Sequence, residues 1–397
     1  MKKNILKFPT FFLIIILLTG CGPSYTSLVK TAVTGTASLA YNTVKYTGKS
    51  VIYTLKPSGL YSDVNKVNNI LFVPLISLIK NASQTWGEKN TKIPTKKEYV
   101  KYMQNYKSRA LVDFDKGIIT VETLDNTDYQ TSLKNAIITT LLLPDDPRSA
   151  DLFSAKKITF NSTPYLFGEV KDNKNKNINS TKEASKYANY LLNKKYKTKS
   201  ITKNNKRVKV HYVTIKMVKD HTNIRVQKVK PFVKRYAKKY NISENLIYAI
   251  IKTESNFNQF AVSHTGALGL MQIVPTSAGV DSNKFVNNSS STPSKTYLFN
   301  AQNNIEFGVA YLHILNNRYL TGINNPISKE YCVISAYNTG SGNVLKTFSS
   351  NQRKAKKEIN SKSSSAIYKK LRNDLPYEET RNYLKKVINN KKQFVDI

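Results

Sequence analysis

A carboxyl side chain at the end of an apolar helical face is the first feature that could do chemistry. Ile247, Ile250 and Ile251 recur at helical spacing, and Glu254 follows on the same face. Burial there would raise the pKa of Glu254 and keep the group protonated near neutral pH, as a general acid requires. The competing interpretation is that Glu254 projects beyond the core or pairs with a basic group. Periodicity alone favours that second interpretation.

Two later segments contain residue types that suit sugar binding. Residues 264–272 read HTGALGLMQ. The glycines would let the backbone approach a ligand closely, and Gln272 offers both a donor and an acceptor. Residues 334–342 end an apolar stretch with Tyr337 and Asn338 before a glycine turn. Taken singly, each segment could equally be an ordinary turn or the end of a helix.

Together and in this order, these segments resemble the lytic transglycosylase domain of the lysozyme-like superfamily. The resemblance rests on Glu254-Ser255, on residues 269–272 and on residues 336–338. Residues 379–383 (ETRNY) resemble the closing segment of that family. Thr339 departs from the pattern, because the family commonly has a second glycine after the Tyr-Asn pair.

The preceding part of the chain agrees with this resemblance. Residues 99–102, 112–115 and 144–149 look like the N-terminal domain that accompanies the catalytic domain in membrane-bound members of the family. The later residues 294–299 fit the same pattern. The resemblance covers roughly residues 96–390 and becomes weak over 22–95.

The resemblance implies cleavage of the MurNAc-β-1,4-GlcNAc bond of peptidoglycan, leaving a 1,6-anhydro end on MurNAc. It implies that Glu254 is the catalytic acid and base. The implied substrate-binding residues are Ser255, Met271, Gln272, Tyr337, Asn338 and Tyr383. No cofactor and no metal are implied, and the partner would be a peptidoglycan glycan strand.

The count of carboxylates bears on the mechanism. Four acidic residues lie between 251 and 350, and only Glu254 belongs to a motif that could face a sugar. Most glycosidases need two carboxylates, so a site with one would need the substrate to provide its own nucleophile. Two alternatives stay open: a hydrolytic muramidase on the same scaffold, and a non-catalytic peptidoglycan-binding lipoprotein.

The N-terminus predicts export and lipidation. Lys2, Lys3 and Lys7 precede an unbroken apolar run over residues 11–18, which is too short to span a bilayer and is typical of a secretory signal. Residues 18–21 (LTGC) resemble the bacterial lipobox, in which the cysteine is acylated. We therefore expect a lipoprotein signal peptide over 1–20, lipidation of Cys21, and an outer-membrane lipoprotein that faces the periplasm. A secretory signal with a chance cysteine is the alternative.

The strong positive charge first suggests a nucleic-acid partner. Lys and Arg total 62 against 25 Asp and Glu, a formal net charge of +37. The export signal argues against that partner, and no nucleic-acid-binding motif accompanies the charge. Residues 251–350 hold 6 basic and 4 acidic residues, so the catalytic region is nearly neutral and the charge lies in its flanks. We expect no nucleic acid, and anchoring to outer-membrane lipid through acylated Cys21.

The patterning predicts an α+β fold: a mixed α+β domain over 96–225, then a mainly α, lysozyme-like domain over 226–397. A lipid anchor and tether would occupy 21–95. Within the first domain we expect a hairpin over 108–124, helices over 131–143 and 181–195, and a strand over 206–218. The core face of that strand would carry Val208, Val210 and Tyr212. We also expect Asn241 to cap the helix that carries Glu254.

Overall fold

The computed structural model describes residues 73–160, 162–263 and 265–395, together with four short strands nearer the N-terminus. β1 (Leu13–Ile16) pairs antiparallel with β2 (Leu28–Thr31), and β3 (Tyr41–Tyr46) pairs with β4 (Lys49–Thr54). These strands belong to a unit over residues 1–68 that is separate from the unit over 69–397. Cys21 and most of the predicted signal peptide lie outside the described residues. No described helix is both long and apolar enough to cross a membrane.

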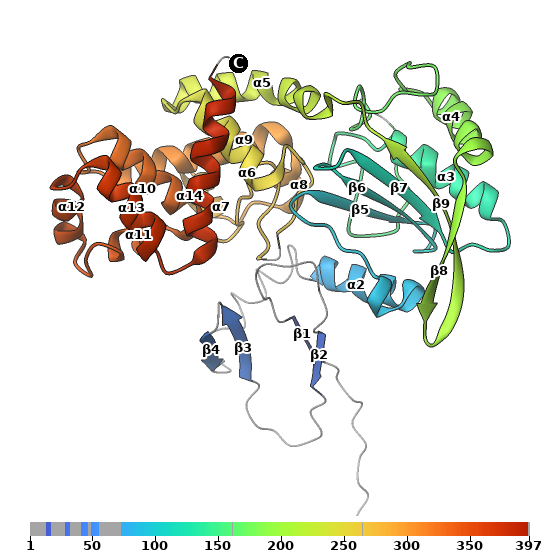
Figure 1. The fold of residues 1–397 in the computed structure, drawn as a ribbon, viewed down its shortest axis with the longest axis horizontal. Helices are drawn as coiled ribbons and strands as arrows, with labels where there is room; N and C mark the ends of the chain where they lie inside the picture. The colour runs from blue at the N-terminus through green and yellow to red at the C-terminus, as the bar shows by residue number, and fades with distance from the viewer. Residues whose placement is uncertain are drawn as a thin grey trace, which may run out of the picture. The chain divides into compact units, whose positions relative to one another are not determined.

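A five-stranded antiparallel sheet forms the first part of the larger unit, with strand order β5-β6-β7-β9-β8 (Figure 1). Its strands are β5 (Glu98–Met103), β6 (Ser108–Asp113), β7 (Ile118–Thr123), β8 (Lys197–Lys203) and β9 (Lys206–Lys216). The predicted hairpin over 108–124 is confirmed by the pairing of β6 with β7. Gly117 permits its turn by adopting a φ of +63°.

Two helices cover this sheet domain where the sequence predicts them. α3 (Tyr129–Leu141) packs on β6 and β7, and α4 (Thr181–Lys194) packs on α3. The predicted core face of β9 is wrong in part, because Val208 and Tyr212 are only half-buried. The opposite face carries the buried Val213 and Ile215, which pair with β7 beneath α3.

Residues that the sequence places in a tether include a packed helix, α2 (Val73–Trp86), followed by a short 3-10 turn, η2 (Glu88–Asn90). The Trp86 side chain is fully buried and its indole N–H donates to the carbonyl of Tyr106 at 2.7 Å. The guanidinium of Arg109 lies 3.6 Å from the Trp86 ring centroid and pairs with Glu122. These contacts attach α2 to the sheet.

A long helix, α5 (His221–Tyr240), runs from the sheet domain to the helical domain (Figure 1). Near its start, Arg225 donates to the buried Glu169 at 2.6 Å and lies 4.9 Å from the Phe114 ring centroid. Further along, α5 packs against α6 and α9 of the helical domain. The predicted domain boundary at residue 225 therefore falls inside a continuous helix that contacts both domains.

The second domain is mainly α, as predicted, and the α+β fold class is confirmed. Its helices are α6 (Glu244–Ser255), α7 (Ala278–Asn287), α8 (Lys295–Phe299), α9 (Ala301–Ile314), α10 (Pro326–Thr339), α11 (Ser341–Lys346), α12 (Gln352–Asn360), α13 (Ser364–Asp374) and α14 (Glu378–Lys391). A π-helical turn, η3 (Leu315–Tyr319), extends α9, and a 3-10 turn, η4 (Lys392–Phe394), extends α14.

The predicted capping of α6 by Asn241 is wrong. Asn241 instead ends α5 in the left-handed conformation, with φ +53°. Ser243 occupies the N-cap position of α6 and makes no side-chain capping bond. The chain reverses between the two helices, and Asn tolerates the left-handed conformation that this reversal requires.

We predict that Trp86→Ala destabilises the protein by about 3–5 kcal/mol, because it empties a fully buried site and removes the Arg109 stacking contact. Urea unfolding of the purified protein measures the change. Phe160→Ala is the matched control, since that aromatic ring is 44% exposed in the same domain, and its cost should stay below about 1 kcal/mol. Equal effects of the two changes would contradict the assignment of α2 to the folded core.

Candidate active site

Glu254 lies in the last turn of α6, on the buried face that the sequence predicts. Residues 246–251 of this helix are all buried, and Glu254 itself is 4% exposed. Its Oε2 lies 3.2 Å from the Nζ of Lys96, in the loop before β5. Burial raises the pKa of Glu254 above its usual range, although the Lys96 ammonium and the Tyr383 hydroxyl act in the opposite direction. The carboxyl group is therefore buried, as the apolar helical face predicts, and it also pairs with a basic group, as the competing interpretation allowed.

Two tyrosines from other helices border the carboxyl group. Tyr383 lies on α14, which packs along α6, and its buried hydroxyl lies near Glu254 without a hydrogen-bond partner among the described residues. Tyr337, on α10, donates its hydroxyl to the carbonyl of Met271 at 2.8 Å. Burial, with the nearby Glu254, raises the pKa of both phenols well above the ordinary value. Both therefore stay neutral hydrogen-bond donors across the physiological pH range.

Ser255 connects α6 to the glycine-containing segment. Its hydroxyl is fully buried and lies 2.7 Å from the carbonyl of Leu270 and 3.1 Å from that of Ile251. The first of these contacts reaches beyond its own helix, so the Ser255 side chain holds the segment around Leu270 against α6. Direct contact of Ser255 with a glycan stays a prediction.

The two other predicted binding residues of this segment also turn inward. Gln272 adopts a φ of +50°, and its amide group donates to the carbonyls of Ala261 and Gly269 at 3.2 and 3.0 Å. The Met271 side chain packs against Gly308 of α9 so closely that a Cβ added there would lie 2.3 Å from the sulfur. These contacts shape the loop, and a glycan contact of either side chain stays a prediction.

Asn304, on α9, is a buried residue of this site that the sequence analysis missed. Its side chain accepts from the backbone N–H of Met271 at 2.7 Å and donates to the carbonyls of Leu268 and Leu298 at 2.9 and 2.7 Å. Asn304 therefore fixes the backbone of the glycine-containing segment at Leu268 and Met271. The detectable signal is its spacing, because Asn304 precedes the apolar Phe307 by three positions and so shares the buried face of the helix.

The remaining predicted residue, Asn338, joins two of the site's helices. Its Oδ1 accepts from the hydroxyl of the buried Thr380 at 2.6 Å, which connects the end of α10 to the first turn of α14. Glu379 lies next to Thr380, with its Oε1 3.8 Å from the Nζ of Lys96. The site is thus assembled by α6, α10 and α14, with Lys96 reaching it from the sheet domain.

The described residues contain no group of three or more His, Cys, Asp or Glu side chains that could hold a metal ion. The only described cysteine, Cys332, is buried in α10, and burial raises its pKa to about 12. His264 falls outside the described residues.

Comparison with known proteins bears on this geometry. Residues 63–228 match the N-terminal domain of membrane-bound lytic murein transglycosylase C, and residues 231–360 match the transglycosylase SLT domain. The membrane-bound lytic murein transglycosylase C of Haemophilus ducreyi is 43% identical over 80% of this chain and 84% of its own. The chain belongs to the membrane-bound lytic murein transglycosylase C family. The Cronobacter sakazakii protein of that name is 45% identical over 77% of this chain and 84% of its own.

The resemblance that the sequence suggested is thereby confirmed. The SLT match contains Glu254, the 261–273 loop and the Tyr337-Asn338 pair, while Tyr383 and Glu379 lie beyond it. A solved structure, the 70-kDa soluble lytic transglycosylase of Escherichia coli, is 26% identical, with a TM-score of 0.31, over 41% of this chain and 23% of its own.

We predict that Gly269→Ala in this lytic transglycosylase lowers the free energy of unfolding by more than about 2 kcal/mol. Gly269 has a φ of +78°, and an added Cβ would lie 2.2 Å from the Asn304 amide nitrogen. Gly342→Ala is the control, because its added Cβ meets no atom within 4 Å and it lies inside α11. That change should be neutral or slightly stabilising. Denaturant unfolding compares the two, and an equally mild Gly269→Ala would show that the loop is not fixed as described.

Proposed function

We propose that this murein transglycosylase breaks the MurNAc-β-1,4-GlcNAc bond without water, using Glu254 alone as acid and then as base. The supporting observation is the buried carboxyl group of Glu254, which has a raised pKa and lies within the SLT-matched segment. Burial favours the protonated form, and a protonated carboxyl group can donate to the glycosidic oxygen.

In the first step, Glu254 gives its proton to the glycosidic oxygen as the bond from that oxygen to the MurNAc C1 breaks. The acetamido oxygen of the same sugar would stabilise the positive charge at C1, as in substrate-assisted glycosidases. In the second step, the Glu254 carboxylate takes the proton of the MurNAc C6 hydroxyl while that oxygen bonds to C1. The 1,6-anhydro ring closes and Glu254 regains its proton. The high effective concentration of an intramolecular hydroxyl favours ring closure over attack by water.

Glu379 is the carboxylate that a two-carboxylate hydrolase could use instead, since it lies near the same lysine as Glu254. Its side chain is 56% exposed, whereas that of Glu254 is 5% exposed. The second carboxylate of such a hydrolase acts in its ionised form, as base or nucleophile, so exposure does not exclude Glu379 from that role. The non-hydrolytic mechanism needs no second carboxylate, and we assign Glu379 no step in it.

We predict that Glu254→Gln lowers the rate of peptidoglycan cleavage by at least about 10³-fold, because the amide cannot transfer the proton. Binding to purified sacculi should persist, since the shape of the site is kept. Glu379→Gln is the matched control, and its rate should stay within about tenfold of wild type. Mass spectrometry of released muropeptides should give products about 18 Da lighter than hydrolytic ones.

Two outcomes would contradict this mechanism. Lytic activity of Glu254→Gln at the wild-type rate would remove Glu254 from the chemistry. Wild-type products at the hydrolytic mass would favour a muramidase on the same scaffold.

We also propose that the protein is an outer-membrane lipoprotein facing the periplasm, anchored through acylated Cys21. The support is the Leu18–Cys21 lipobox pattern after an apolar run, together with the membrane-bound relatives. Gly22, rather than Asp, follows the cysteine, which favours the outer membrane. Stable membrane anchoring requires more than one acyl chain, and an acylated lipoprotein cysteine would carry several.

We predict that Cys21→Ala moves the protein out of the outer-membrane fraction, because the acceptor of the acyl chains is lost. Cell fractionation with immunoblotting measures the distribution. Cys332→Ala is the control, since that buried thiol lies in α10 and should leave the distribution unchanged. Retention of the Cys21→Ala protein in the outer membrane would overturn the lipid-anchor assignment.

A further inference from the structure

The sheet domain places one side chain, Lys96, against the carboxyl group of the other domain. Lys96 and Glu254 are 158 positions apart in the chain, yet their charged atoms lie 3.2 Å apart. The same Nζ is 3.8 Å from Glu379. The Lys96 side chain is 32% exposed, whereas that of Glu254 is 5% exposed.

The loop that carries Lys96 is held on the catalytic domain by its backbone. The carbonyl of Thr95 accepts from the N–H of Val262, and the carbonyl of Lys96 accepts from the Asn258 side chain, both at 3.3 Å. Both donors belong to the segment that directly follows α6. The position of Lys96 is therefore coupled to the segment that follows Glu254 in the chain.

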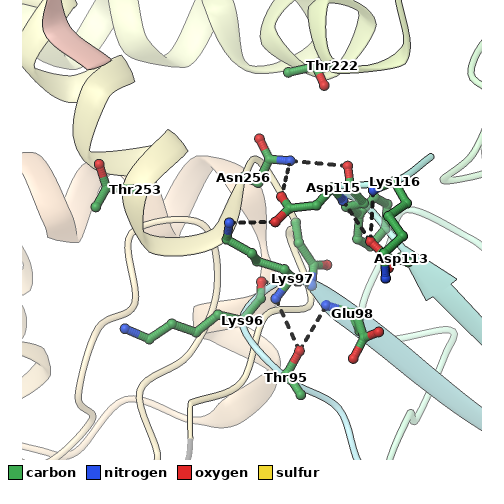
Figure 2. Close-up of polar contacts among 12 residues, drawn as sticks. Thr95, Lys96, Lys97, Glu98, Asp113, Asp115, Lys116, Thr222, Thr253 and Asn256 are labelled. Carbon is green, nitrogen blue, oxygen red and sulfur yellow. Dashed lines mark hydrogen bonds and ion pairs between the residues drawn. The ribbon is translucent and has the colours of Figure 1, made fainter. Parts of the chain in front are cut away.

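A cluster of three side chains, Lys97, Asp115 and Asn256, also holds the Lys96 loop on the catalytic domain (Figure 2). Asp115 accepts from Lys97 at 2.6 Å and from Asn256 at 2.8 Å, and Asn256 also donates to the carbonyl of Phe114 at 3.1 Å. Asn256 is the residue that ends α6 in the left-handed conformation. The Lys96 side chain points away from this cluster (Figure 2). The cluster therefore anchors the loop and leaves the Lys96 ammonium group directed at Glu254.

We propose that Lys96 is a positioning residue for Glu254: its ammonium group orients the carboxylate and balances its charge after the proton has been donated. This inference rests on the proposed role of Glu254 as acid and base. A buried carboxylate without a counter-charge is costly, so the lysine would stabilise the state between the two proton transfers. The N-terminal domain is then part of the catalytic unit.

The pH dependence of the reaction distinguishes positioning from a structural role. The groups that face Glu254 are Lys96 from the loop, Glu379 and Tyr383 from α14, and Tyr337 from α10. Lys96 lowers the pKa of Glu254, so Lys96→Met should raise it and keep the acid protonated to higher pH. In the pH profile of muropeptide release, measured at low substrate concentration, the alkaline limb should move up by about one pH unit. Lys96→Arg should keep the wild-type limb.

The assay uses full-length protein in detergent, purified sacculi and a series of pH values. Lys92→Met is the control, because it removes one positive charge from an exposed position in the same segment and should leave the limb unchanged. Carboxyl ¹³C NMR of glutamate-labelled protein, with Glu254→Gln to assign the signal, reports the pKa of Glu254 even where a variant is inactive. Lys96→Gln serves as a second neutral variant should Lys96→Met fold poorly.

A folded Lys96→Met protein whose alkaline limb and Glu254 titration both stay at wild type would overturn the inference. If Glu254→Gln is inactive in the same assay, the proposed function survives that result. An active Glu254→Gln protein would instead remove the proposed function, on which the role of Lys96 depends. An upward shift of the Glu254 titration in both neutral lysine variants, with Lys96→Arg unchanged, supports the inference.

Discussion

The burial of one carboxyl group is the constraint on which this site depends. Glu254 ends an apolar helical face and is almost entirely removed from water, which is unfavourable for its ionised form. The Lys96 ammonium group, 3.2 Å from the carboxyl group, reduces that cost by supplying an opposite charge. A group held between protonated and ionised forms in this way suits a reaction in which one residue must act as acid and then as base.

The segment from residue 256 to 273 is held from inside the catalytic domain and from outside it. Inside, Ser255, Gln272 and Asn304 bind the backbone carbonyls and N–H groups of the loop. Outside, the sheet domain binds Asn256 and Asn258, and α5 contacts both domains as one continuous helix. Loops that carry function need a rigid scaffold. Here the scaffold includes the N-terminal domain as well as the helices of the SLT-matched segment.

Local sequence patterns predicted the elements better than their orientation. The β6–β7 hairpin and helices α3 and α4 follow from turn residues and helical periodicity, which act over a few positions. The core face of β9 could not be predicted from such local signals, because both faces of that strand carry apolar residues. The covering helix α3 decides which face is buried. Asn241 shows the same limit, since Asn suits both a helix N-cap and a left-handed C-cap.

The sequence by itself determined the family and the central residue. Glu254 follows an apolar stripe, and the segments around Gln272 and Tyr337 come after it in a specific order. Only the tertiary structure decided what the neighbouring side chains do. Ser255, Met271 and Gln272 turn inward to shape the loop, and Asn304 and Lys96 enter the site from distant parts of the chain. The physical reason is that hydrogen bonds and ion pairs require atoms within a few ångströms, and packing of whole domains, not spacing along the chain, brings those atoms together.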